Sequence, residues 1–436
     1  MKTTSNKPKL GLWTGTSLVA GTMIGSGVFL LPSTLASFGG ISILGWLVSS
    51  TGAILIALML GRLSRRIPLS GGPYEYTRVA FGDSLSFLVG WGFWFSMLTA
   101  GAAVSVATVG YLGIFFPVLI QHPVNSGIAA VVVIWSLVGL NMAGVKAAGR
   151  FQFTILLLKL LPLVMVIIAG LLFFQGSHFQ PFNRSGESIF SAISATGALT
   201  LWAFGGMEAA SVAAEDIKDP GRNVARVTTF GVLLAAGVYI LSTVGVMAVL
   251  PPEALEGSSA PFADAATQSI GPFAGSIIAA GAVIACLGAL NGLIFVQGRI
   301  PFAMARDKLF PARFSRLSKR GTPTFSLVVS GLIITVFMWL NYSENIVDLF
   351  TYIILLSTLS FLLPYAFSAV AELVLLAKTK DKIDKQKLRL NLVLGVLAYF
   401  FAMWMVVGVG KEAGYWGLIL FLSGLPVYAL IKWQKA

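Results

Sequence analysis

The sequence predicts an all-α membrane protein, because apolar runs of about 20 residues recur along its whole length, and about that many residues are needed to span a bilayer as a helix. Apolar residues make up 56% of the 436 residues, charged residues make up 11%, and the mean hydropathy is +0.86. Although the net charge is +13, no soluble basic domain is present. The composition therefore excludes a nucleic-acid-binding module.

Twelve apolar runs are long enough to span a bilayer, with polar connections between them. We place the spans at about 11–37, 41–64, 84–116, 124–144, 151–174, 188–214, 224–250, 273–298, 323–341, 346–376, 390–409 and 413–431. The first run is too long for a cleavable signal peptide, and no small-residue cleavage site comes before the next spans.

The basic residues predict the orientation, because Lys and Arg near span ends favour the cytoplasmic side. All but three of the 30 basic residues fall at the N-terminus, in the loops after even-numbered spans, at the edges of those loops, or in the C-terminal tail. The exceptions are Arg184, Lys411 and Lys159. Both termini are therefore expected in the cytoplasm, and the positive charge also favours contact with anionic lipid headgroups.

The residue types that bind metals or carry redox chemistry are scarce. Cys286 is the only cysteine and lies inside an apolar run, so it cannot form a disulfide within the chain. His122 and His178 fall in separate loops. We expect no metal site and no cofactor.

Two of the spans contain glycines that should interrupt a helix. The first span has Gly25-Ser26-Gly27, and the sixth has Gly205-Gly206. Irregular backbone is tolerated at membrane depth only where protein or a water-filled cavity satisfies its polar groups. Matching breaks in two halves of a chain are typical of inverted-repeat transporters. The alternative is close helix packing, for which Gly21-x-x-x-Gly25 would suffice.

The matching breaks also predict the domain organisation. We expect a cytoplasmic segment at 1–10 and a ten-helix transport core at 11–376, built as a 5+5 inverted repeat with broken helices 1 and 6. A basic cytoplasmic loop follows at 377–389, and 390–436 holds helices 11 and 12 with the tail. An enzyme is not expected, because no cluster of nucleophiles, acids or metal ligands is visible. A sensor that keeps the fold without transport remains an alternative.

The ends of two broken helices match the two charged groups of an α-amino acid. Where a helix restarts, free N–H groups and the positive dipole end favour a carboxylate, for which we expect the amides of Ser26 and Gly27. Where a helix stops, unpaired carbonyls favour an ammonium group. The carbonyls expected there belong to Met23, Trp202, Ala203 and Gly205. Sugars and inorganic ions fit such a site less well.

Short motifs along nearly the whole chain resemble the amino acid–polyamine–organocation superfamily, and within it the bacterial antiporters of basic amino acids and polyamines. The motifs are Gly25-Ser26-Gly27-Val28-Phe29, Gly71-Gly72-Pro73-Tyr74-Glu75-Tyr76, Thr200-Leu201-Trp202-Ala203-Phe204, Asp219-Pro220-Gly221-Arg222-Asn223, Gly321-Thr322-Pro323 and Leu363-Pro364-Tyr365. The resemblance implies twelve helices, alternating access and exchange or proton-coupled movement of an amino acid. It also implies a bacterial cytoplasmic membrane location. The expected partners are the substrate and the lipid bilayer, with a homodimer left open.

The resemblance also suggests roles for four further positions. It places an aromatic cover over the substrate at Trp202, site or gate residues at Ser357 and Tyr365, and a proton-sensing glutamate at Glu208. The alternative for Ser357 and Tyr365 is an ordinary hydrogen bond between helices. The alternative for Glu208 is a neutral structural hydrogen bond.

Lys159 lies inside the fifth span, where an unpaired ammonium group costs about 3 kcal/mol or more. In a second branch of the superfamily, sodium-independent transporters carry a lysine on this helix in the place of a sodium ion. By this resemblance Lys159 argues against sodium coupling. Because a desolvated lysine loses its proton more easily, Lys159 is also a candidate for gating or proton coupling. The alternative is a lysine that snorkels to the interface.

The substrate is predicted from departures from the family pattern. The arginine/agmatine antiporter holds the guanidinium with asparagine, methionine and tryptophan side chains, where this chain aligns Gly101, Val104 and Leu293. Asn291 resembles instead the Asn-Gly pair of neutral amino-acid exchangers. A guanidinium among apolar groups would leave donors unpaired at about 1–3 kcal/mol each. A neutral L-amino acid is therefore preferred, with arginine/agmatine or another cationic amino acid or polyamine as the alternative.

Overall fold

The structure, a computed structural model, describes residues 11–433 except 70, 144, 213, 215–216, 341–345 and 379–383. The expected segment 1–10 and part of the basic loop 377–389 lie outside these residues. The helices of the first half are α1 Leu12–Met23, α2 Ser26–Ala36, α3 Ser42–Arg66, α4 Pro73–Phe81, α5 Asp83–Leu112, α6 Val118–Gln121, α7 Pro123–Ala143 and α8 Val145–Leu172.

The second half repeats this pattern of long helices with short ones between them. Its helices are α9 Ile189–Leu201, α10 Ala209–Val212, α11 Pro220–Val249, α12 Pro252–Glu256, α13 Pro261–Ser269, α14 Pro272–Arg306, α15 Thr324–Leu340 and α16 Ile346–Lys378. The chain continues with α17 Lys385–Gly408, α18 Lys411–Leu422 and α19 Gly424–Trp433. Short 3₁₀ turns lie at η1 Gly39–Ile41, η2 Gly176–Phe179, η3 Trp202–Phe204 and η5 Ala312–Ser315.

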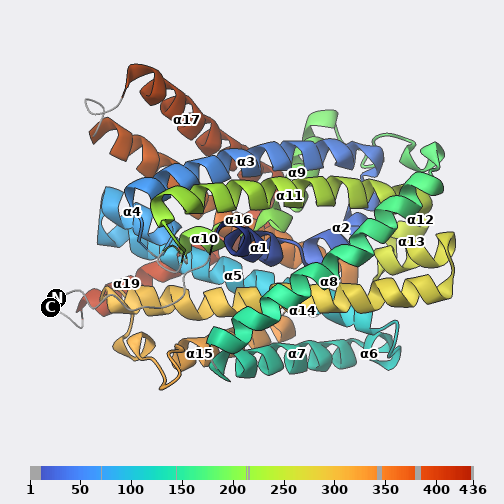
Figure 1. Cartoon of the computed structure of the whole chain (residues 1–436), viewed down its shortest axis with the longest axis horizontal. Helices are drawn as coiled ribbons and strands as arrows, with labels where there is room; N and C mark the ends of the chain where they lie inside the picture. Colours follow the sequence, from blue (N-terminus) through green and yellow to red (C-terminus); the bar gives the residue numbers. More distant parts are fainter. Residues whose placement is uncertain are drawn as a thin grey trace.

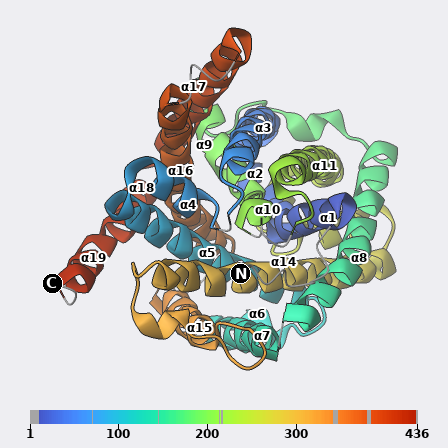
Figure 2. The ribbon, with the colours of Figure 1, turned by 60° about the vertical axis from the view of Figure 1, so that its left-hand side comes forward.

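The long helices form two packed groups with the broken helices between them. On one side α3 packs against α11, and on the other α5 and α14 pack against α7 and α15 (Figure 1). The first broken helix contacts both groups, α1 with α11 and α14, and α2 with α11 and α5, while α9 of the second packs on α3 and α16. The helices α17 and α19 project outside this body (Figure 2). The broken helices therefore lie where protein can satisfy their open backbone groups.

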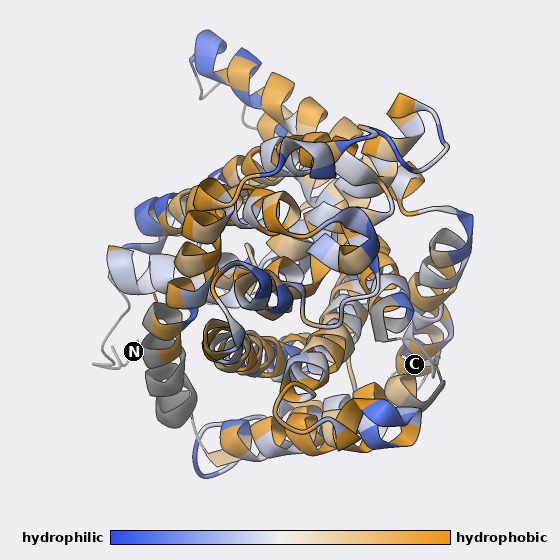
Figure 3. Cartoon of the chain, turned by 90° about the vertical axis from the view of Figure 1, so that its right-hand side faces the viewer, coloured by the Kyte–Doolittle hydropathy of each residue, from blue (hydrophilic) through white to orange (hydrophobic). Residues whose placement is uncertain are grey.

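The all-α membrane architecture is confirmed. Among the described residues, nine helices are long and apolar enough to cross a membrane. Three shorter apolar helices, Leu158–Leu172, Ile189–Phe204 and Thr324–Met338, accompany them. Apolar residues cover the outer helices, and hydrophilic residues gather at helix ends and loops (Figure 3). The count of twelve spans stays a prediction.

Two features differ from the expected spans. The last span is divided at Ser423 into α18 and α19, because Pro426 has no N–H to bond the Leu422 carbonyl four positions earlier. The connections also contain short helices that the apolar runs did not predict. Helix α4 lies at one end of the molecule, and α12 and α13 lie at the other (Figure 1).

Candidate functional site

The first predicted break is confirmed. Helix α1 ends at Met23, Ile24 is extended (ψ 97°), and α2 begins at Ser26. Only glycine fits at position 25, because a Cβ there would lie 2.3 Å from the Cβ of Ala289 on α14. The backbone of the break at Gly25 therefore packs directly against α14.

The second predicted break faces the first. Helix α9 ends at Leu201, the turn η3 follows, and Gly206 adopts a positive φ of 104° that favours glycine. A Cβ on Gly206 would lie 2.8 Å from Cγ2 of Thr22, and a Cβ on Gly27 would lie 2.9 Å from Cβ of Ala203. The two irregular segments are therefore in direct contact.

A small cavity lies between the breaks, bounded also by α5, α14 and α16. Most of the predicted binding residues line it: Met23, Gly27, Trp202, Ala203, Gly205, Leu293 and Ser357. The Trp202 ring is 5% exposed and packs edge-on against Phe350, with ring centroids 5.4 Å apart. Trp202 thus closes one wall of the cavity.

Two predicted residues are placed differently. Gly101 and Asn291 are not among the residues that line the cavity. The Asn291 Oδ1 accepts a hydrogen bond of 2.9 Å from Asn141 on α7, and Gly101 faces the amide of Gln297. The side chain of Ser26 lies outside the described part of the chain.

The cavity also has walls that the sequence reasoning missed. These are Thr22, Met97, Ala100, Ala289 and Phe361. Helical spacing could have found some of them, because Ala289 lies one turn before Leu293 and Ala100 one turn before Val104. The cavity surface is mainly apolar.

Lys159 reaches the end of the first half-helix. Its side chain is fully buried, and Nζ donates to the carbonyls of Gly21 and Ile24, the latter at 2.6 Å. A continuous helix would have used these carbonyls four residues further on, so the break leaves them without their helical partners. The ammonium lies at the break, which is not the position of a snorkelling lysine.

Glu208 lies just after the second break. Its carboxylate accepts hydrogen bonds from the Gly206 N–H at 3.2 Å and from the Tyr365 hydroxyl on α16 at 2.6 Å. Glu208 and Tyr365 are both 1% exposed. Glu208 and Tyr365, two of the predicted gating or proton-coupling residues, therefore link the broken helix to α16. Ser357 also bonds between helices, donating to the Ser96 carbonyl at 2.9 Å.

Part of the acceptor set expected for an ammonium is already engaged. The Ala203 carbonyl accepts from the Tyr239 hydroxyl at 2.8 Å, and the Trp202 carbonyl accepts from the Gly205 N–H at 2.9 Å. A carbonyl has two lone pairs, so each can accept one further hydrogen bond. The second break therefore retains acceptor capacity.

Helices α12 and α13 close one end of the molecule over α2. The Ser33 hydroxyl donates to the Ser258 carbonyl at 2.7 Å, and the Phe262 ring packs on Phe29 with centroids 5.0 Å apart. The Tyr111 hydroxyl donates to the Phe29 carbonyl at 2.6 Å. All of these side chains are buried.

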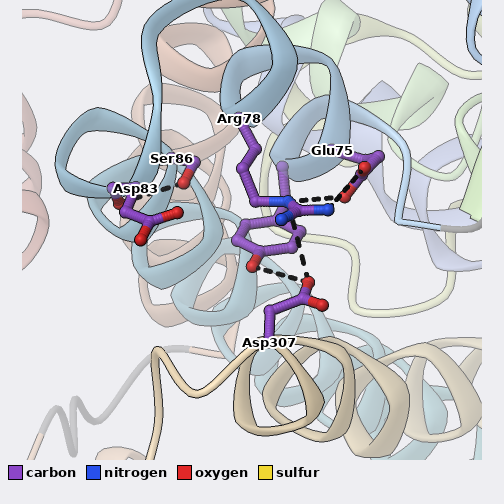
Figure 4. A network of polar contacts seen from close by, with 6 residues as sticks. Glu75, Arg78, Asp83, Ser86 and Asp307 are labelled. Carbon is purple, nitrogen blue, oxygen red and sulfur yellow. Dashed lines mark hydrogen bonds and ion pairs between the residues drawn. The ribbon is translucent and has the colours of Figure 1, made fainter.

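A polar network ties α4 to the end of α14 at the other end of the molecule (Figure 4). Arg78 pairs with Glu75 at 2.9 Å and lies 3.8 Å from Asp307, which also accepts from the Tyr74 hydroxyl at 3.0 Å. Burial, together with the Asp307 charge, raises the pKa of Tyr74, so its phenol stays protonated as a donor. The molecule thus has a set of buried or polar contacts at each end, α13 on α2 and α4 on α14.

Comparison with known proteins relates this chain to a family of transporters. A family described as amino acid permease matches residues 10–429. A Bacillus subtilis protein provisionally named an arginine/ornithine antiporter is 33% identical, over 98% of each chain. The cadaverine/lysine antiporter of Escherichia coli is 34% identical over 84% of this chain and 83% of its own. The putrescine transporter PotE of Escherichia coli is 29% identical over 97% and 96%.

Proposed function

The chain belongs to the amino acid permease family, and we propose that it is a sodium-independent antiporter of basic amino acids and polyamines. The coarser conclusion, a permease-type transporter and not an enzyme, follows from the family match and the relatives. We place it in the bacterial cytoplasmic membrane with both termini in the cytoplasm, as the basic residues indicate.

The observation that carries this proposal is the cavity between two opposed helix breaks. We infer that the first N–H groups of α2, at Ser26 and Gly27, hold the substrate carboxylate. The carbonyls around Trp202 and Ala203, with Met23, hold the α-ammonium. A diamine presents ammonium groups without a carboxylate and uses the second half of this site.

The Lys159 ammonium supports the absence of sodium coupling. It occupies two carbonyl oxygens at the end of α1 that could otherwise bind a cation. A fixed positive charge there repels sodium, since two unit charges a few ångströms apart in a low dielectric interact strongly.

Glu208 and Tyr365 are proposed to couple the binding site to gating. Their hydrogen bond joins the restarting half of the broken helix to α16. Movement of either element would break this bond, and a proton taken up by the carboxylate would change it. In the proposed cycle, the contacts of α13 on α2 and of α4 on α14 open alternately around the fixed site.

The relatives favour basic substrates, because their names specify arginine, ornithine, lysine, cadaverine and putrescine. The neutral L-amino acids preferred from the sequence are the second candidate. Their support is the apolar lining at Val104 and Leu293.

Competition in proteoliposomes separates the two candidates. With unlabelled lysine inside and labelled lysine outside, we expect ornithine, arginine, cadaverine and putrescine to inhibit uptake about tenfold more strongly than leucine or methionine. The reason is that an ammonium recognised in a buried site contributes hydrogen bonds of about 1.5–3 kcal/mol. Uptake of labelled leucine is measured in parallel, so that transport of a neutral amino acid is also detected.

Stronger inhibition by leucine and methionine in both assays would favour the neutral candidate. If none of the labelled solutes moved, the protein would instead belong to the non-transporting sensors.

A further inference from the structure

The C-terminal part of α16 forms a buried ion pair with α3. The Nε of Arg62 donates to Oε1 of Glu372 at 2.5 Å, and its Nη2 donates to Oε2 at 2.8 Å. The Glu372 side chain is 1% exposed and the Arg62 side chain 14%. A guanidinium that bonds both carboxylate oxygens fixes the direction of both side chains. The pair therefore allows only a narrow range of positions of α16 against α3.

The free energy of unfolding alone does not account for a buried ion pair. Taking two charges out of water costs free energy that their attraction only partly returns, so well-packed apolar residues of similar volume often stabilise a protein as much or more. A buried pair can instead specify the register of two helices, because sliding one helix along the other leaves both charges unpaired. Arg62 and Glu372 would then fix the position of whatever else lies on the same face of α16.

Tyr365 lies on that face of α16. It comes seven positions before Glu372, and residues seven apart in a helix lie two turns apart on the same side. Its hydroxyl bonds the Glu208 carboxylate at 2.6 Å. A shift of α16 by one residue would move Tyr365 by about 1.5 Å along the helix and turn it by about 100°, which would break this bond. The bond to Glu208 therefore depends on the register of α16.

The other contacts of α16 with the broken helices and α3 are sparse. Helix α16 packs mainly against α5, α17, α18 and α4, and much less against α2, α3 and α9. Toward α2, the hydroxyl oxygens of Thr351 and Thr34 lie 3.0 Å apart. From the side of α17, a Cβ at Gly395 would lie 3.2 Å from Oε2 of Glu372. The carboxylate is therefore held between α3 and α17, where α16 has few other polar contacts with α3.

We propose that Arg62 and Glu372 are positioning residues for gating: their ion pair sets the register of α16 on α3 and thereby aligns Tyr365 with Glu208. The inference rests on the proposed function, in which the bond between Tyr365 and Glu208 couples the binding site to gating. Neither Arg62 nor Glu372 lines the cavity. The pair therefore acts on the rate of exchange and leaves substrate affinity to the ends of the broken helices.

A mutant cycle tests this inference. The variant Arg62→Met/Glu372→Leu removes both charges together, so neither is left buried without a partner. We expect it to bind L-lysine in a direct assay as the wild type does, and to exchange labelled lysine about tenfold more slowly, because Tyr365 is no longer held opposite Glu208. Tyr365→Phe alone should slow exchange to a similar extent. In the Tyr365→Phe background, the double change should cause no further loss.

Two further variants complete the cycle. Asp83→Leu/Lys432→Met is the matched control, because it removes an exposed pair, 3.9 Å apart, between α5 and α19. It should leave exchange unchanged in both backgrounds. Glu372→Gln keeps the shape of the side chain but turns an NH₂ group toward the guanidinium, so it loses the paired bonds without a cavity. It should slow exchange only where Tyr365 is present, and it decides the test if the apolar pair does not fold.

The outcomes separate the inference from the function on which it rests. Exchange at the wild-type rate by Glu372→Gln and by the apolar pair would show that the ion pair does not position Tyr365. Equal slowing with and without the Tyr365 hydroxyl would also contradict the inference, because the pair would then act by another route. If Tyr365→Phe exchanges lysine as fast as the wild type, the proposed gating bond to Glu208 is itself wrong, and the inference is wrong with it.

Discussion

Lys159→Ala is expected to reduce exchange about 100-fold while the protein still inserts and remains monodisperse. The variant removes the ammonium group from the carbonyls of Gly21 and Ile24 and leaves both buried without this partner. Hydrogen bonds to a charged group contribute about 1.5–3 kcal/mol each, so a loss of about 3 kcal/mol in the transport-competent state corresponds to about 100-fold. Initial rates of exchange in proteoliposomes measure the effect.

Lys411→Ala is the control for this variant, because Lys411 is an exposed lysine in a predicted outer loop. Its exchange rate should equal that of the wild type. Replacing sodium by choline should also leave the wild-type rate unchanged. Normal exchange by Lys159→Ala, or wild-type uptake driven by a sodium gradient, would show that Lys159 is not the resident cation of this site.

Gly27→Val is expected to abolish substrate binding. A Cβ at position 27 would lie 2.9 Å from the Ala203 Cβ, 3.1 Å from the Ala203 Cα and 3.2 Å from the Trp202 ring. A backbone Cα cannot move aside as a side-chain tip can, and valine adds two further methyl groups. The variant must therefore separate the two breaks, and we expect affinity to fall about 100-fold or more in a direct binding assay.

Gly237→Val controls for the cost of valine in a membrane helix. Gly237 is exposed on α11, and a Cβ there has no neighbour within 4 Å among the described residues. Its affinity should match the wild type, and Gly27→Ala should fall between the two. Binding by Gly27→Val within about twofold of the wild type would mean that the substrate does not lie between the breaks.

The positions of the helix breaks could be predicted because glycine pairs act locally. Gly206 takes its positive φ through its own backbone freedom, and a glycine pair is visible in the sequence without any partner. Gly25 is required instead by its close approach to Ala289. Lys159 could be identified as unusual because an ammonium inside an apolar run is costly. Its two acceptors could not be predicted, since they depend on how α8 packs across α1.

The directions of the amide side chains on α14 could not be predicted for the same reason. Asn291 and Gln297 are both amides on α14, six positions apart, and a helix points such residues in different directions. The structure directs Asn291 toward α7 and Gln297 toward α5. The break between α18 and α19 was not predicted although Pro426 marks it. The prediction of a span rested on the length of the apolar run, and this length does not reveal a local break.

The central claim is that the opposed ends of the broken helices recognise the α-ammonium of the substrate. Direct binding of L-lysine and Nα-acetyl-L-lysine to the purified wild-type protein tests this most directly. The acetylated compound keeps the carboxylate and the terminal ammonium, adds an acetyl group, and loses the charge that the carbonyls around Trp202 and Ala203 are proposed to hold. We predict that it loses most of its affinity, about tenfold or more. Equal affinity of the two compounds would contradict the account, even if the protein exchanged lysine.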